Sequence, residues 1–153
     1  MSKKKRLKKQ KAPKNNKSIS ENLRKPPDIG QNFVQWTVCE MDHEYGGSWD
    51  WHLKSNEAYK VLGYLEELSK KTWGEVEQER TGNKDGHRKH HSMLVSELCK
   101  EARDRLKERF QNEELPEELY RFRLAGKVRL WGMRSQTTFK LIWFDRNHEV
   151  YPV

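Results

Sequence analysis

Residues 120–131, YRFRLAGKVRLW, constrain the fold more than any other stretch of this chain. Apolar side chains alternate there with Arg or Lys on both sides of an Ala125-Gly126 break. Strict alternation is typical of a strand with one buried face, and a short break containing Gly predicts a tight hairpin. We therefore expect two antiparallel strands joined at Ala125-Gly126, with one apolar face and one cationic face.

The register of this hairpin follows from its turn. A three-residue loop, Leu124-Ala125-Gly126, would place Gly126 at the left-handed position that such turns need. The apolar pairs are then Tyr120–Leu130 and Phe122–Val128, and the cationic pairs are Arg121–Arg129 and Arg123–Lys127. Like charges opposed across a ladder cost roughly a few tenths to 1 kcal/mol per pair. Four cations on one face therefore suggest an anion site, such as one for phosphates; a solvated face, or pairing with acidic residues from elsewhere, is the alternative.

Charge is distributed unevenly along the 153 residues, a length typical of one domain with appendages. Residues 1–25 hold eleven Lys or Arg and one acidic residue, whereas the rest of the chain is close to neutral. Such a segment buries too little apolar surface to order itself. We expect a disordered Lys-rich arm over residues 1–29, which either adds affinity for nucleic acid or only aids solubility, and a single domain over 30–153.

Several classes of protein lack support in the sequence. The two cysteines, Cys39 and Cys99, form no CxxC motif or disulfide framework, which suits a reducing compartment. No apolar run has membrane-spanning length. There is no P-loop, Rossmann glycine pattern, HExxH or GxSxG. We expect a cytoplasmic protein with no membrane partner and no cofactor.

The remaining elements predict an α+β domain, with helices packed on a small, mainly antiparallel twisted sheet. The expected strands are 33–40, the two of the hairpin, 139–144 and 149–151. Residues 48–53 form either a strand or an aromatic plug, and residues 92–95 are compatible with an extended segment. The expected helices run from a cap at Ser55 or Asn56 to about Lys70, from a capping box at Thr72 to about Glu79, and from Glu97, capped by Ser96, to Phe110. The expected core comprises Trp36, Leu65, Leu98, Leu106, Phe122, Leu130, Leu141 and Trp143.

Three histidines, His87, His90 and His91, lie in a loop and raise the question of a metal site. Zinc sites need three or four ligands and usually a recognisable spacing. The sequence offers no second ligand motif beside the isolated His148. We therefore expect histidines that are hydrogen-bonded or solvated, and no metal.

The C-terminal part, about residues 93–153, resembles the RelE/YoeB-like superfamily of bacterial toxins. The resemblance rests on the basic pair Arg121 and Arg123, on GKVRLWG (126–132) and on WFDRNHEVYP (143–152). The last two motifs are similar to those of an uncharacterised branch found in phages and bacteria.

This resemblance implies a RelE-like fold and an endoribonuclease that cleaves mRNA without a metal, on the ribosome, with a cognate antitoxin as a partner. It implies that the RNA backbone is bound by Arg121, Arg123, Lys127 and Arg129. It also implies that Arg134 or Arg146 contacts the scissile phosphate, and that His148 and Tyr151 take acid–base or stacking roles. The alternative is a noncatalytic module of a phage or mobile element that binds nucleic acid or another protein.

Overall fold

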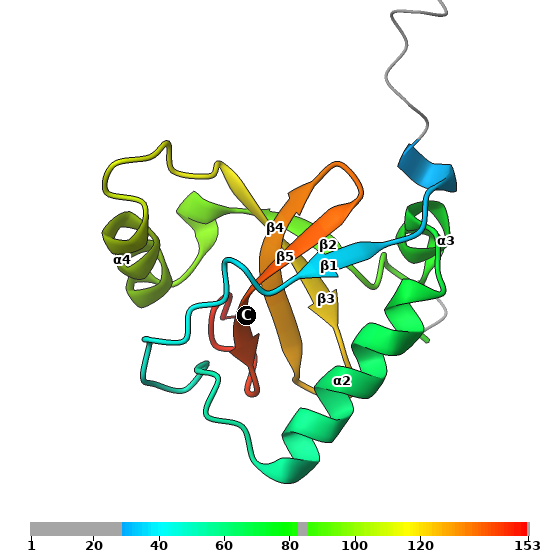
Figure 1. The fold of residues 1–153 in the computed structure, drawn as a ribbon, viewed down its shortest axis with the longest axis horizontal. Coiled ribbons are helices and arrows are strands. Elements are labelled where there is room, and N and C mark those ends of the chain that lie inside the picture. The colour runs from blue at the N-terminus through cyan, green and yellow to red at the C-terminus, as the bar shows by residue number, and fades with distance from the viewer. Residues whose placement is uncertain (1–28, 83–85, 153) are drawn as a thin grey trace, which may run out of the picture.

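The computed structural model describes residues 29–82 and 86–152, and the arm expected over residues 1–29 lies outside them except for Ile29. The described residues form an α+β fold with a five-stranded mixed sheet of order β1-β5-β4-β3-β2 (Figure 1). Its strands are β1 (Gln35–Thr37), β2 (His91–Leu94), β3 (Glu118–Arg123), β4 (Arg129–Ser135) and β5 (Thr138–Asp145). Strand β1 runs parallel to β5, and the other neighbours are antiparallel. The expected α+β class is confirmed.

Helices cover the two faces of this sheet. They are α2 (Ser55–Ser69), α3 (Trp73–Gln78) and α4 (Lys100–Arg109), with short 3-10 turns at Ile29–Gln31 and Val95–Glu97. Figure 1 shows α2 and α3 on one side of the molecule and α4 on the other. We call the sheet surfaces beneath them the α2 face and the α4 face. The α2 face carries a buried cluster that includes Leu65, Trp73, Phe122, Leu130 and Leu141, and the α4 face one that includes Trp49, Leu98, Leu106, Trp131 and Trp143.

A bulge in β5 lets successive side chains reach the same face. Trp131 pairs with Trp143, but Gly132 pairs with Leu141, so Ile142 is an extra residue without a partner in β4. Both Ile142 and Trp143 therefore pack in the cluster on the α4 face. Gly132 is required here, because a Cβ atom would collide with the carbonyl oxygen of Lys140.

The predicted register of the hairpin is wrong. Phe122 pairs with Leu130 and Arg123 with Arg129, and Leu124 N–H donates to the carbonyl of Val128. The loop still has three residues, but they are 125–127, with Gly126 at φ 62° in its middle. Because Leu124 pairs with Val128, both side chains pack against the apolar cluster of the α2 face. In the expected register, Leu124 would lie in the loop and could not pair with Val128. The shift moves each partner by two positions, so the side chains of both strands keep their predicted faces, but Lys127 now lies in the loop.

The helices agree with the sequence except at one start. Thr72 accepts a hydrogen bond from Glu75 N, as its capping box predicts, and α2 begins at Ser55. Helix α4, however, begins at Lys100 rather than after Ser96. Residues 95–97 form a 3-10 turn instead, and Cys99 N–H donates to Val150 O, outside any helix.

Residues 48–53 form no strand but an aromatic plug, in which Trp49 is buried and stacks on Tyr45 at 3.7 Å. Residues 149–151 form no strand either. Of the predicted core, only Trp36 is wrong: it is 37% exposed at the edge of the sheet, where its indole donates to Ser69 Oγ.

No helix among the described residues has the length and apolar character needed to cross a bilayer.

Candidate anion-binding site

Three arginines project from the centre of the sheet onto its α4 face. Arg121 and Arg123 lie two residues apart on β3, and Arg129 on β4 pairs directly with Arg123. Side chains opposed across an antiparallel pair lie on the same face. Arg121 pairs with Trp131, and its guanidinium lies 5.9 Å from the centre of the indole ring. The expected cationic face therefore exists with Arg121, Arg123 and Arg129; we call these three the arginine cluster.

Two members of the arginine cluster are incompletely hydrogen-bonded. Arg129 is only 7% exposed, and its Nη1 donates to the carbonyls of Gly126 at 2.8 Å and Val128 at 2.9 Å. The Nε atoms of Arg121 and Arg129 are buried and have no partner among the described residues. Burial and the charges of Arg121 and Arg123 lower the pKa of Arg129 to about 10, which leaves it protonated at neutral pH. Burial and Arg123 likewise lower the pKa of Arg121.

Asp145 is the acidic residue closest to Arg129 in the sheet, but its oxygens are engaged elsewhere. It pairs with Arg129 across β4 and β5 and is fully buried. Its carboxylate accepts hydrogen bonds from Glu149 N at 2.9 Å, Val150 N at 3.0 Å and Trp131 Nε1 at 3.2 Å. Because the N–H groups of Glu149 and Val150 donate to Asp145, they are not available for the strand that was expected over residues 149–151. Across the described residues, no ion pair within 4.0 Å joins a carboxylate to the arginine cluster.

His148 lies in the turn that Asp145 organises. Its φ is 58°, a left-handed conformation that His, Asn and Asp adopt more readily than most residues. The ring Nε2 lies 3.2 Å from Arg121 Nη1, so the neutral ring accepts a hydrogen bond from the guanidinium. Burial lowers the pKa of His148, and the charges of Arg129 and Arg121 lower it further. His148 is therefore unprotonated at neutral pH and lies beside two cations.

Tyr151 lies near the same group. It is partly buried against the cluster on the α4 face, and its phenol oxygen is close enough to act on the pKa of Arg121. Of the residues that the sequence suggested, the structure therefore brings together Arg121, Arg123, Arg129, His148 and Tyr151.

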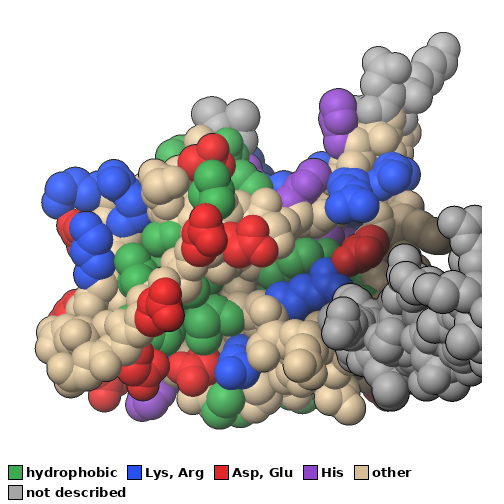
Figure 2. Space-filling view, turned by 90° about the horizontal axis from the view of Figure 1, so that it is seen from above, with side chains coloured by type: hydrophobic (Ala, Val, Ile, Leu, Met, Phe, Trp, Pro, Cys, Tyr) green, Lys and Arg blue, Asp and Glu red, His purple; other side chains and the backbone are tan. Residues whose placement is uncertain are grey.

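A pocket of about 440 Å³ opens beside Arg121 and Arg123. His91 on β2 lies directly opposite Arg121 and lines it, as do Arg88 and Lys89. His148 does not line it. In Figure 2, most of the His side chains on the visible face lie toward one end beside several Lys or Arg side chains. Further Lys or Arg side chains lie at the opposite end, and acidic side chains lie between the two ends. We call this cavity the basic pocket.

His90 has a structural role, as the hydrogen-bonded alternative predicts. It is 3% exposed, its Nδ1 accepts from Arg123 N at 3.0 Å, and its Nε2 lies 3.2 Å from Glu79 Oε2. Burial lowers the pKa of His90 to about 4, although Glu79 acts in the opposite direction. A neutral ring with its proton on Nε2 satisfies both contacts and links β3 to Glu79 through His90.

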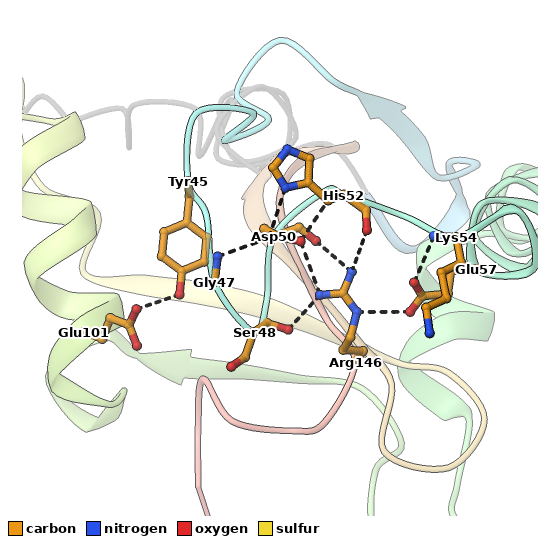
Figure 3. Close-up of polar contacts among 9 residues, drawn as sticks. All are labelled: Tyr45, Gly47, Ser48, Asp50, His52, Lys54, Glu57, Glu101 and Arg146. Atoms are coloured by element: carbon orange, nitrogen blue, oxygen red, sulfur yellow. Dashed lines mark hydrogen bonds and ion pairs between the residues drawn. The ribbon is translucent and has the colours of Figure 1, made fainter.

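Arg146 lies away from the arginine cluster in a network of its own (Figure 3). Its Nε donates to Glu57 Oε2 at 3.0 Å, and its Nη1 donates to Ser48 O at 2.8 Å and Asp50 Oδ1 at 3.3 Å. Nη2 reaches the carbonyls of Asp50 and His52, both at 3.3 Å. These contacts fasten the loop before α2 to the start of that helix, and leave Arg146 with few donors for a phosphate.

Two other suggested residues also lie apart from His148. Arg134 is on the α2 face, where it donates to Glu77 Oε1 at 2.6 Å and lies 3.9 Å from the ring centre of Trp73. Lys127 is exposed in the hairpin loop and, with the corrected register, is not opposite Arg123.

Sequence reasoning missed three residues of this region: His91, Arg88 and Asp145. The loop histidines were considered only as metal ligands, and the pairing of His91 with Arg121 depends on a strand contact that local patterns do not reveal. Asp145 had a local signal, because Asp often accepts hydrogen bonds from N–H groups that follow it in a turn.

Among residues 29–82 and 86–152, no three His, Cys, Asp or Glu side chains are placed to hold a metal ion. The chain matches no model of a protein family, and searches of curated proteins and of solved structures likewise found no match.

Proposed function

We propose that this chain is a RelE-like, metal-independent endoribonuclease that holds the RNA backbone on its arginine cluster and uses His148 in catalysis. The observation that carries the proposal is the 3.2 Å contact between His148 Nε2 and Arg121 Nη1, beside the buried Arg129. It unites a proton acceptor and two phosphate-binding groups in one place.

The electrostatics of the arginine cluster support an anionic ligand. A buried charge without a partner is costly, and the guanidinium N–H groups match the oxygens of a phosphate in paired, charge-assisted hydrogen bonds. A phosphodiester would complete the bonding of Arg121 and Arg129 and offset their repulsion with Arg123.

The proposed reaction needs no metal. When the phosphate binds, Arg121 Nη1 turns from His148 Nε2 to a phosphate oxygen. His148 Nε2 then accepts the proton of the 2′-hydroxyl, the 2′ oxygen forms a bond to phosphorus, and the bond to the 5′ oxygen breaks. That oxygen takes a proton from Tyr151 or from solvent. Arg121 and Arg129 stabilise the negative charge that develops on the phosphorane, the role that preorganised donors take in such sites.

A noncatalytic RNA-binding module is the second candidate. It is favoured by one observation: the basic pocket is lined by Arg121 and Arg123 but not by His148. Phosphates could therefore bind there away from His148, the proposed proton acceptor.

A cleavage assay separates the two candidates. Labelled RNA, free and on translating ribosomes, is incubated with the protein in excess chelator, beside DNA of the same sequence. We expect the wild type to cut RNA and not DNA, because DNA has no 2′-hydroxyl. His148→Asn should bind RNA nearly as well but cut it roughly 10²-fold or more slowly. Uncut RNA in both settings would reject the nuclease and leave the binding module.

A further inference from the structure

The basic pocket is distinct from the contact between Arg121 and His148, although it shares Arg121 with it. Its charged and imidazole-bearing lining residues are His87, Arg88, Lys89, His91, Arg121 and Arg123. None of its described lining residues is acidic. Thr81 adds a hydroxyl group to this lining.

We propose that the basic pocket binds a second phosphate of the same RNA strand, so that the ligand is a single strand spanning two adjacent phosphate sites. This inference rests on the proposed function, because it takes the arginine cluster as the first site. Arg121 and Arg123 belong to both sites: Arg121 Nη1 faces His148, and both side chains line the pocket.

The spacing of the cations favours an extended strand over a single small anion. Arg121 and Arg123 are two residues apart on β3, and such neighbours are roughly 6.6–6.8 Å apart along a strand. His91 lies opposite Arg121 on β2 and continues the row of basic groups across the sheet. Grooves that track a single-stranded backbone have this arrangement.

His91 adds a group suited to RNA. Burial lowers its pKa, and the charge of Arg121 lowers it further, so its ring is neutral at pH 7. A neutral imidazole in a half-buried position offers a surface on which an unstacked base can stack.

Arg88 is the residue at which to test the second site. Arg88 is exposed. Lys89 is less suitable, because its Nζ lies 3.6 Å from Glu79 Oε2 in an ion pair. Lys60 on α2 is a matched control, because it is an exposed cation that does not line the basic pocket.

The experiment measures the affinity of 2′-O-methyl RNA oligomers of one, two and four nucleotides, each with a 5′-phosphate, at several salt concentrations. The blocked 2′ oxygen prevents cleavage, so binding is read independently of catalysis. We compare the wild-type full chain with Arg88→Gln, Lys60→Gln and Arg121→Gln/Arg129→Gln.

We expect Arg88→Gln to weaken binding of the tetramer roughly fivefold, the upper range for one exposed charge, and to leave the mononucleotide unaffected. The slope of log affinity against log salt should become shallower by about 0.7, the value for one phosphate contact to a single strand. Lys60→Gln should change neither quantity. If Arg88→Gln matches Lys60→Gln while Arg121→Gln/Arg129→Gln still weakens binding, the second site is rejected and the first stands. If the wild type binds no oligomer, both are rejected.

Discussion

Arg121 Nη1 lies 3.2 Å from His148 Nε2, although the two residues come from a strand and from the turn after the last strand. This contact depends on Asp145, whose carboxylate holds the N–H groups of Glu149 and Val150 and so shapes the turn. Arg121 and His148 thus lie together, and the turn that carries His148 is held by a buried residue that need not touch a ligand.

The arginine cluster should cost stability in the free protein. Replacing Arg121 and Arg129 together with Gln removes two repelling charges, so the free energy of unfolding should stay the same or rise slightly, while RNA affinity falls. Denaturant unfolding and RNA titration measure the two effects. Arg134→Gln is the control, since it removes an ion pair with Glu77 and a stacking contact with Trp73 and should lower stability by about 1 kcal/mol. Equal losses of stability in both variants would contradict a repulsive cluster.

Two substitutions of His148 can separate a loss of stability from a loss of catalysis, because the backbone of this residue is left-handed. At φ 58°, Ala is disfavoured and Asn is tolerated. His148→Ala should therefore be less stable than His148→Asn by about 1 kcal/mol, whereas both should lose cleavage. Denaturant melts of the two variants test this. If only His148→Ala lost cleavage, the ring would have no chemical role.

Asp145 should act as a positioning residue. In Asp145→Asn, the amide NH₂ must face at least one of the three donors that the carboxylate now satisfies, which should cost about 1–3 kcal/mol. The turn should loosen and the contact between His148 and Arg121 should break. The separating measurement is the pKa of His148 by NMR. Loss of the Asp145 charge alone would lower this pKa, whereas movement of the ring into solvent, away from Arg121 and Arg129, should raise it toward its ordinary value. A destabilised variant in which the pKa of His148 does not rise would show that Asp145 supports the fold without positioning the ring.

His90 makes stability depend on pH in a defined window. Its pKa is about 4 in the folded protein against 6.5 in the unfolded chain, so between these values the unfolded chain binds more protons. Stability should therefore fall as the pH falls from about 6.5 to 4, by up to about 3 kcal/mol from this group. In His90→Asn, which can keep the bond from Arg123 N, this loss should be smaller. Unfolding curves across the window test it; identical pH dependence in the two proteins would contradict the assignment.

The face on which each hairpin side chain lies follows from local strand geometry, whereas the register of the hairpin does not. Alternation fixed the faces of Arg121 and Phe122 correctly, because side-chain direction depends only on strand geometry. The register did not follow from Gly126 alone, because packing of Leu124 and Val128 against the α2 face decided where the loop begins.

Contacts between distant segments account for the remaining differences. Trp36 alternates like a core residue but lies at the sheet edge, where β5 is its only neighbouring strand among the described residues. Arg134 and Arg146 are cations of the same kind as Arg121, yet Glu77 and Glu57 neutralise them. Only the fold distinguishes these paired arginines from those of the arginine cluster.

The most direct measurement is the pKa of His148, determined by NMR with and without a saturating 2′-O-methyl RNA dinucleotide. In the free protein, burial and the charges of Arg129 and Arg121 lower this pKa. A phosphodiester bound between those arginines would offset their charge, so the pKa of His148 should rise on binding. It should not respond in Arg121→Gln/Arg129→Gln. If the dinucleotide binds the wild type and the pKa of His148 does not change, the arginine cluster and His148 do not form one phosphate site.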